Sequence, residues 1–178
     1  VVGVDPSEGT GNDNSAIEVW EFPSMEQVFE YTNNTISPQV LYTVLKNVIN
    51  ILTKVSNEIY FSIESNSVGL AVIALYETDE NPPDALFVSE NGKNKLGFKT
   101  TAPTKLRFCT KLKELIESNS WKINSLEYVN ELKNFSSFNG TSNVLLAKNY
   151  GVPAIGTVAH EWTMGISGLV SLNRANKF

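Results

Sequence analysis

Hydrophobic residues along this chain recur at two spacings, and each spacing predicts a different kind of element. Short runs of β-branched and aromatic residues predict strands. These strands are expected over residues 1–4, 15–22, 27–31, 59–64, 85–88 and 121–123. Apolar residues three or four positions apart predict helices, over about 38–52, 68–76, 101–116 and 126–135. Antiparallel strands followed by helix-linked strands predict a mixed α/β layer and argue against an all-parallel dinucleotide-binding sheet.

The first predicted helix carries the clearest signals. Ser37-Pro38 supplies an N-cap and a first-turn proline. Its expected apolar positions are Val40, Leu41, Val44, Leu45, Val48 and Leu52. A later helix that begins near Pro103 is expected to bury one side. That side consists of Leu106, Cys109, Leu112 and Ile116, and it makes the single cysteine a core thiol.

Two carboxylates each end a predicted strand. Asp5 and Glu64 both follow β-branched runs and precede Gly, Ser or Asn. Adjacent strands that end this way bring their acids to one sheet edge, which predicts a site for Mg²⁺ or Mn²⁺. Taken singly, a turn-forming Asp5 before Pro6 and a helix-capping Glu64 beside Ser65 and Ser67 are the alternative interpretations.

Composition and charge narrow the classes of function. The chain has 178 residues, is 42% hydrophobic and carries a net charge of −5, which argues against a protein that coats nucleic acid by bulk attraction. Its apolar stretches are shorter than the roughly 18 residues of a membrane span. The chain starts at Val1, inside a predicted strand and without an initiator Met, so we expect a fragment of a longer protein.

One stretch of the chain is basic without interruption by an acid. It contains Lys93, Lys95, Lys99, Lys105, Arg107, Lys111 and Lys113. A solvated helix face is one interpretation of such a run, and a track for a phosphate backbone is the other.

Five segments, in this order and at this spacing, share a likeness with one family. They run from Asp5 to Asp13, Ile63 to Gly69, Gly97 to Lys105, Leu112 to Glu117 and Glu131 to Phe135. This pattern resembles the nuclease domain of large terminase subunits of myovirus-type tailed bacteriophages. The resemblance implies a ribonuclease H-like fold over residues 1–135. It also implies a metal-dependent endonuclease that cuts concatemeric double-stranded viral DNA by two-metal phosphodiester hydrolysis.

The same resemblance assigns roles to acidic residues. Asp5 and Glu64 match two of the family's three metal-binding catalytic acids, and Asp13 matches an accessory acid, with Mg²⁺ or Mn²⁺ as the cofactor. The family's third acid lies in a His-Asp-Asp motif that this chain lacks, which would impair the nuclease. Glu161, at the start of a predicted helix, is the candidate substitute.

Basic residues and partners follow from the same source. Lys99 and Lys105 match positions near the DNA, and Arg107 and Lys111 continue that stretch. The implied partners are double-stranded viral DNA, a terminase ATPase domain N-terminal to this fragment and a portal protein. The implied location is the host cytoplasm, without a membrane.

The chain after Phe135 departs from that family. Gly140-Thr141-Ser142-Asn143 and Ala159-His160-Glu161-Trp162 begin a likeness that runs to Phe178. This stretch resembles nicotinate phosphoribosyltransferases. The resemblance implies that ATP phosphorylates His160 and that the 140–143 loop lies by the phosphoribosyl site. Only about forty residues of a larger barrel enzyme are present, so phosphoribosyl transfer by this chain alone is not expected. A structural histidine is the alternative for His160.

Together these patterns predict two parts. Residues 1–135 are expected to form a ribonuclease H-like nuclease domain. Residues 136–178 are expected to form an atypical helix-strand-helix tail packed on it. The main functional expectation is the terminase endonuclease. The alternatives are a fragment of nicotinate phosphoribosyltransferase, in NAD biosynthesis, and a non-catalytic DNA-binding module.

Overall fold

The computed structural model describes residues 1–90, 95–129, 136–137 and 140–141. Within them, five strands form one mixed sheet in the order β3-β2-β1-β4-β5. The strands are β1 (Val2–Asp5), β2 (Ser15–Glu21), β3 (Glu26–Asn33), β4 (Tyr60–Ile63) and β5 (Leu86–Phe87). The helices are α1 (Pro38–Leu52), α2 (Ser67–Thr78) and α3 (Ala102–Glu117). A separate two-stranded pair joins β6 (Ser136–Ser137) to β7 (Gly140–Thr141).

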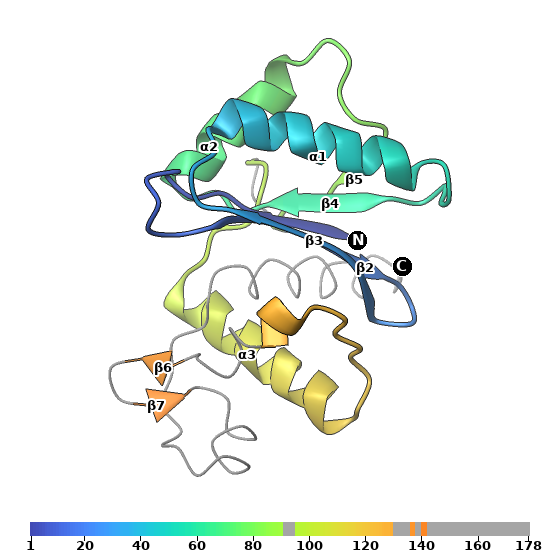
Figure 1. Ribbon diagram of the computed structural model, residues 1–178, viewed down its shortest axis with the longest axis vertical. Helices are drawn as coiled ribbons and strands as arrows, with labels where there is room; N and C mark the ends of the chain where they lie inside the picture. The colour runs from blue at the N-terminus through green and yellow to red at the C-terminus, as the bar shows by residue number, and fades with distance from the viewer. Residues whose placement is uncertain (91–94, 130–135, 138–139, 142–178) are drawn as a thin grey trace.

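The sheet is antiparallel on one side of β1 and parallel on the other. β1 pairs antiparallel with β2, and β2 pairs antiparallel with β3. β4 lies parallel to both β1 and β5, so the chain must cross over between these strands. The crossovers run through α1 and α2, which lie on one side of the sheet, while α3 lies on the other side (Figure 1).

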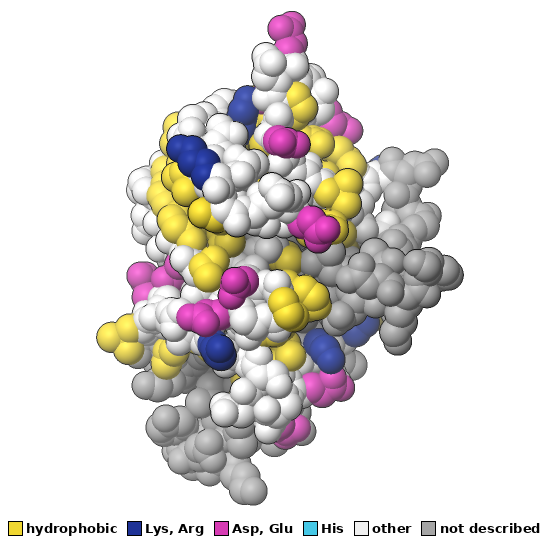
Figure 2. Space-filling model, turned by 90° about the vertical axis from the view of Figure 1, so that its right-hand side faces the viewer, with side chains coloured by type: hydrophobic (Ala, Val, Ile, Leu, Met, Phe, Trp, Pro, Cys, Tyr) yellow, Lys and Arg dark blue, Asp and Glu magenta, His cyan; other side chains and the backbone are white. Residues whose placement is uncertain are grey.

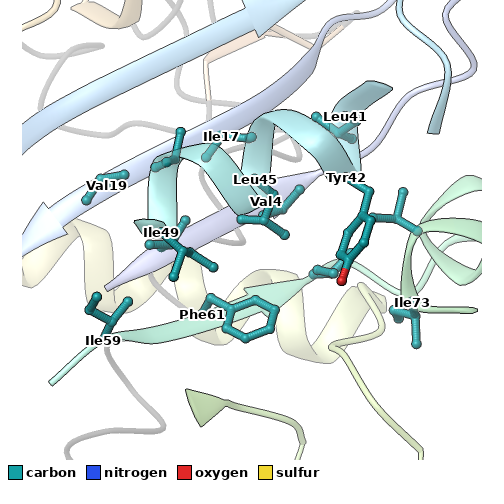
Figure 3. Packing of buried hydrophobic residues seen from close by; sticks show 14 residues of the cluster. Val4, Ile17, Val19, Leu41, Tyr42, Leu45, Ile49, Ile59, Phe61 and Ile73 are labelled. Carbon is teal, nitrogen blue, oxygen red and sulfur yellow. The ribbon is translucent and has the colours of Figure 1, made fainter. Parts of the chain in front are cut away.

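The main core lies between the sheet and α1. Val2 is in register with Val19 on β2 and with Phe61 on β4, so these three side chains share one face of the sheet. Leu45 and Ile49 of α1 are fully buried against that face (Figure 3). Alternate residues of β1, β2 and β4 therefore point into this core.

The buried side of α1 contains Leu41, Leu45 and Val48 as predicted, and Val44 and Leu52 are partly buried against the core. Ser37 Oγ accepts a hydrogen bond from Val40 N at 3.3 Å, which confirms the predicted N-cap. Val40 itself is 48% exposed, whereas Tyr42 and Ile49 are buried. The buried stripe is therefore the predicted one, shifted slightly round the helix so that it includes Tyr42 and Ile49 and leaves Val40 in solvent.

The opposite face of the sheet is covered by a second cluster. Phe108 and Leu112 of α3 are buried, and a capping box between Thr101 and Thr104 begins this helix. Leu112 was predicted to be buried, whereas Phe108 was not. The indole ring of Trp20 packs on this face against Trp121, with 4.8 Å between ring centroids, and against Tyr128 at 5.9 Å. These contacts link β2 to the chain that follows α3.

Residues after α3 dock on the edge strand β3. The strand predicted over 121–123 is reduced to one parallel bridge between Lys122 and Glu26. Gln27 Oε1 accepts hydrogen bonds from Asn124 N at 3.0 Å and Ser125 N at 2.9 Å, and its Nε2 donates to Glu18 at 2.8 Å. Side-chain contacts thus replace most of the expected strand pairing.

The predicted closing helix over 126–135 is helical over residues 126–129, and the rest lies outside the described residues. The predicted helix-strand-helix tail also lies outside them, apart from β6 and β7. The mixed sheet with helices on both sides agrees with the predicted α/β layer, and a ribonuclease H-like fold stays a prediction.

In the part of the chain that the structure describes, no helix is both long and apolar enough to cross a membrane.

A polar cluster ties α1 to the end of α2. Asp79 Oδ2 accepts hydrogen bonds from Lys46 Nζ and, at 2.8 Å, from the Tyr42 hydroxyl. Lys46 Nζ also donates to Asn81 O at 2.8 Å. The hydrogen bond from Lys46, followed by those from Asn81 N and Tyr42, lowers the pKa of Asp79 from 3.8 to about 2. Burial and the neighbouring carboxylate raise the pKa of Tyr42.

We expect Asp79→Asn to lower the thermal stability of the chain at pH 6 and to change its pH dependence. Because the folded-state pKa is depressed, the stabilisation is complete above about pH 4 and is lost as the pH falls through about 2. The difference in Tm between wild type and variant should therefore shrink over that interval, as followed by circular dichroism. Asp84→Asn, at an exposed carboxylate nearby, is the matched control. An unchanged difference in Tm from pH 6 to pH 2 would contradict this role.

Candidate functional site

The parallel pairing of β1 and β4 brings Asp5 and Glu64 together. Val4 is in register with Ile63, and Glu64 N donates to Val4 O at 2.9 Å, so the next residue of each strand lies on neighbouring positions. Both side chains lie on the sheet face opposite the α1 core, because successive residues of a strand alternate between faces. Asp5 is 5% exposed and Glu64 is 1% exposed. The predicted meeting of the two acids is therefore present in the fold.

Asn66 holds the end of β4, the start of α2 and the turn after β1 in one arrangement. Its Oδ1 accepts from Gly69 N at 2.7 Å, which makes Asn66 the N-cap of α2. Its Nδ2 donates to Glu64 Oε2 at 3.0 Å and to Pro6 O at 3.1 Å. Asn66, and not Glu64, thus caps the helix, while the Glu64 carboxylate is oriented by an amide donor. The spacing of Asn66 before the apolar residues of α2 is the sequence signal for this cap.

Two glycines permit close approach of the backbone around Glu64. A Cβ on Gly69 would lie 1.7 Å from Glu64 O, a distance that no side chain could occupy. Gly97 has φ +86°, and a Cβ there would lie 2.6 Å from Ile63 O. This approach allows Phe98 to form a parallel bridge with Glu64. The backbone at Glu64 is therefore closely packed against Gly69 on one side and against Gly97 and Phe98 on the other.

Asp13, the predicted accessory acid, is not part of this arrangement. It is exposed in the turn between β1 and β2, where its backbone O accepts from Ser7 Oγ at 2.8 Å. Ser7 N in turn donates to Ser15 Oγ at 2.9 Å, which closes the turn. No group of three or more His, Cys, Asp or Glu side chains that could hold a metal ion occurs among the described residues. The structure thus brings two of the predicted acids, Asp5 and Glu64, to neighbouring positions.

Two predicted site residues, His160 and Glu161, lie outside the described residues. Their roles as phosphorylated histidine and as third catalytic acid stay predictions.

The predicted basic positions show ordinary surface packing. Lys99 and Arg107 are exposed, and the Arg107 guanidinium lies 5.0 Å from the ring centroid of Phe108. Lys111 Nζ forms an ion pair with Glu114 at 2.9 Å, and Lys105 is half-buried. On the face drawn in Figure 2, basic side chains of the described residues lie among acidic ones. This arrangement matches the interpretation of the basic stretch as a solvated helix face.

The two buried acids supply hard oxygen ligands, which suit Mg²⁺ or Mn²⁺ better than softer metals. Asn66 Nδ2 provides the outer hydrogen bond that orients a ligating carboxylate. The chemistry of these two carboxylates is thus compatible with a hard divalent cation.

Comparison with known proteins places the likeness in the C-terminal third. The model of the nicotinate phosphoribosyltransferase (NAPRTase) family matches residues 116–178. Nicotinate phosphoribosyltransferase of Methanococcoides burtonii is 60% identical over 50 residues, which are 28% of this chain and 12% of that protein. The Methanosarcina mazei enzyme is 52% identical over 52 residues, 29% of this chain and 13% of that protein. The Saccharomyces cerevisiae enzyme is 60% identical over 37 residues, 21% of this chain and 9% of that protein.

These matches support the second resemblance and correct the main functional expectation. They point to homology with nicotinate phosphoribosyltransferase, so the prediction of a terminase endodeoxyribonuclease is wrong. The predicted partners are wrong for the same reason: viral DNA, a terminase ATPase domain and a portal protein. The DNA-binding alternative is wrong with them. The motifs behind the terminase resemblance are not specific to nucleases. Many α/β folds contain acids at strand ends, glycine-rich turns and lysine-rich helices for structural reasons. The chain spans about one eighth of the length of these first two relatives, 12% and 13%.

We expect Asn66→Ala to destabilise the chain by about 1 to 2 kcal/mol, because α2 loses its N-cap. Asn66→Ser removes the amide that donates to Glu64 and Pro6 but keeps a capping oxygen. Because the oxygen remains, this variant should retain most of the stability that the cap contributes. Urea unfolding of the two variants measures the difference. Equal losses in Asn66→Ala and Asn66→Ser would show that the cap contributes little.

Proposed function

We propose that residues 116–178 are a nicotinate phosphoribosyltransferase-like segment and that this segment contributes to phosphoribosyl-transfer chemistry. The observation that carries the proposal is the 60% identity over 50 residues to the Methanococcoides burtonii enzyme, together with the family match over 116–178. Since the chain spans 12% of that relative, the activity is proposed for the segment as part of a larger catalytic unit.

His160 is the residue that this proposal makes reactive. It is the single histidine of the chain. A neutral imidazole nitrogen would attack the γ-phosphorus of ATP, form an N–P bond and release ADP as the P–O bond breaks.

The test is transfer of phosphate from γ-labelled ATP and Mg²⁺ to the full chain. We expect acid-labile, alkali-stable label on wild type and none on His160→Ala, because there is no second histidine to accept phosphate. ATP labelled in the α-phosphate is the control for nucleotide that merely binds. Equal acid-labile label on wild type and His160→Ala would rule out this role for His160, and no label on either protein would show that the transfer needs more of the catalytic unit than this chain contains.

We propose secondly that Asp5 and Glu64 bind a divalent cation, Mg²⁺ or Mn²⁺. The observation in favour is their burial side by side at the ends of parallel strands, with Asn66 donating to Glu64. A bound cation would place positive charge where the two carboxylates converge. Asp5 and Glu64 would hold it, and Asn66 would keep the Glu64 carboxylate in its binding orientation.

Titration with Mn²⁺, followed by the loss of its free electron paramagnetic resonance signal, measures this binding. We expect wild type to bind and both Asp5→Asn and Glu64→Gln to weaken binding by at least about tenfold, because each removes an anionic ligand. Glu8→Gln, at an exposed acid in the adjoining turn, is the matched control and should bind as wild type does. Equal affinity in wild type and both site variants would place any bound Mn²⁺ elsewhere.

A further inference from the structure

Ser62 is a fully buried polar residue on β4. It is 0% exposed, and within the described part of the chain its Oγ has no hydrogen-bond partner. A buried hydroxyl without a partner is unfavourable, because it has lost its hydrogen bonds to water. Such a group in an otherwise well-paired strand calls for a ligand, an ion or a water molecule to satisfy it.

The position of Ser62 relates it directly to the two acids. Ser62 and Glu64 are two residues apart along one strand direction, so they share the sheet face opposite the α1 core, at a Cα separation of roughly 7 Å. On the neighbouring strand β1, the residue in register with Ser62 is Gly3, which lies two residues before Asp5. Gly3 has no side chain, so it contributes neither a hydrogen bond nor a bulky group beside the hydroxyl.

The chemistry of a serine hydroxyl suits a hard cation. Mg²⁺ prefers six oxygen ligands, and two carboxylates leave positions to be filled by neutral oxygens or water. A serine or threonine hydroxyl fills such a position on Mg²⁺ in P-loop proteins. A serine hydroxyl in such a position would offer an oxygen lone pair to the cation and would donate its hydrogen to a carboxylate or a bound water.

We propose that Ser62 Oγ is the third protein oxygen of the divalent-cation site formed by Asp5 and Glu64. This inference rests on the cation site proposed above. It accounts both for the buried, unpartnered hydroxyl and for the need of a two-carboxylate site for further oxygen ligands.

The experiment combines Mn²⁺ titration with thermal unfolding of the full chain with and without Mn²⁺. We expect Ser62→Ala to weaken Mn²⁺ binding by at least about tenfold. The same substitution should leave Tm unchanged or raise it when the ion is absent, since it removes an unsatisfied polar group. Ser62→Thr, which retains the hydroxyl, should recover most of the affinity. A purely structural serine would not give these opposite effects on affinity and on ion-free stability.

Ser15→Ala is the matched control. Ser15 is also buried, but its Oγ accepts a hydrogen bond from Ser7 N at 2.9 Å. This variant should lose stability without Mn²⁺ and keep wild-type affinity. If Asp5→Asn abolishes binding while Ser62→Ala binds as wild type does, the inference about Ser62 is overturned and the cation site stands. Absence of Mn²⁺ binding by the wild-type chain would overturn both.

Discussion

The parallel pairing of β1 with β4 is the constraint on which the described fold depends. β1 lies at the centre of the sheet, antiparallel to β2 on one side and parallel to β4 on the other. Parallel strands need a long connection, which β2, β3 and α1 provide, and α1 covers the apolar face that this pairing creates. The same register sets Asp5 beside Glu64 on the opposite face, so one pairing determines both the core and the candidate site.

The two faces of the sheet place different demands on the chain. On the α1 side, Val4 and Ile63 are completely buried among aliphatic side chains, where shape and volume decide stability. On the α3 side, Asp5, Glu64 and Ser62 are buried as well, and polar groups there must be satisfied by specific partners. Asn66 meets part of that demand through its contact with Glu64. A bound cation would contact all three of these groups, which unites the two proposals about this face.

The family match and the packing of the chain follow different boundaries. The match to nicotinate phosphoribosyltransferases begins at residue 116, in the last turn of α3. Yet Trp121 and Tyr128, inside the matched range, pack on Trp20 of β2, and Asn124 is held by Gln27 of β3. The first residues of the transferase-like segment therefore complete the cover of the N-terminal sheet. The division of the chain near residue 135 stays a prediction.

Local sequence patterns were enough to predict the order of strands and helices up to α3, the N-cap at Ser37 and the placement of Asp5 and Glu64 at strand ends. These features depend on local periodicity and capping chemistry, which short stretches of sequence encode. Long-range contacts settle that Tyr42 and Ile49 of α1 are buried while Val40 is exposed, that the Asn66 amide donates to Pro6 O, that Asn124 and Ser125 dock on Gln27 and that Asp13 stays apart from the paired acids. Each of these depends on contacts between residues far apart in the chain. Their geometry follows from strand register and helix packing, so no local pattern could specify it.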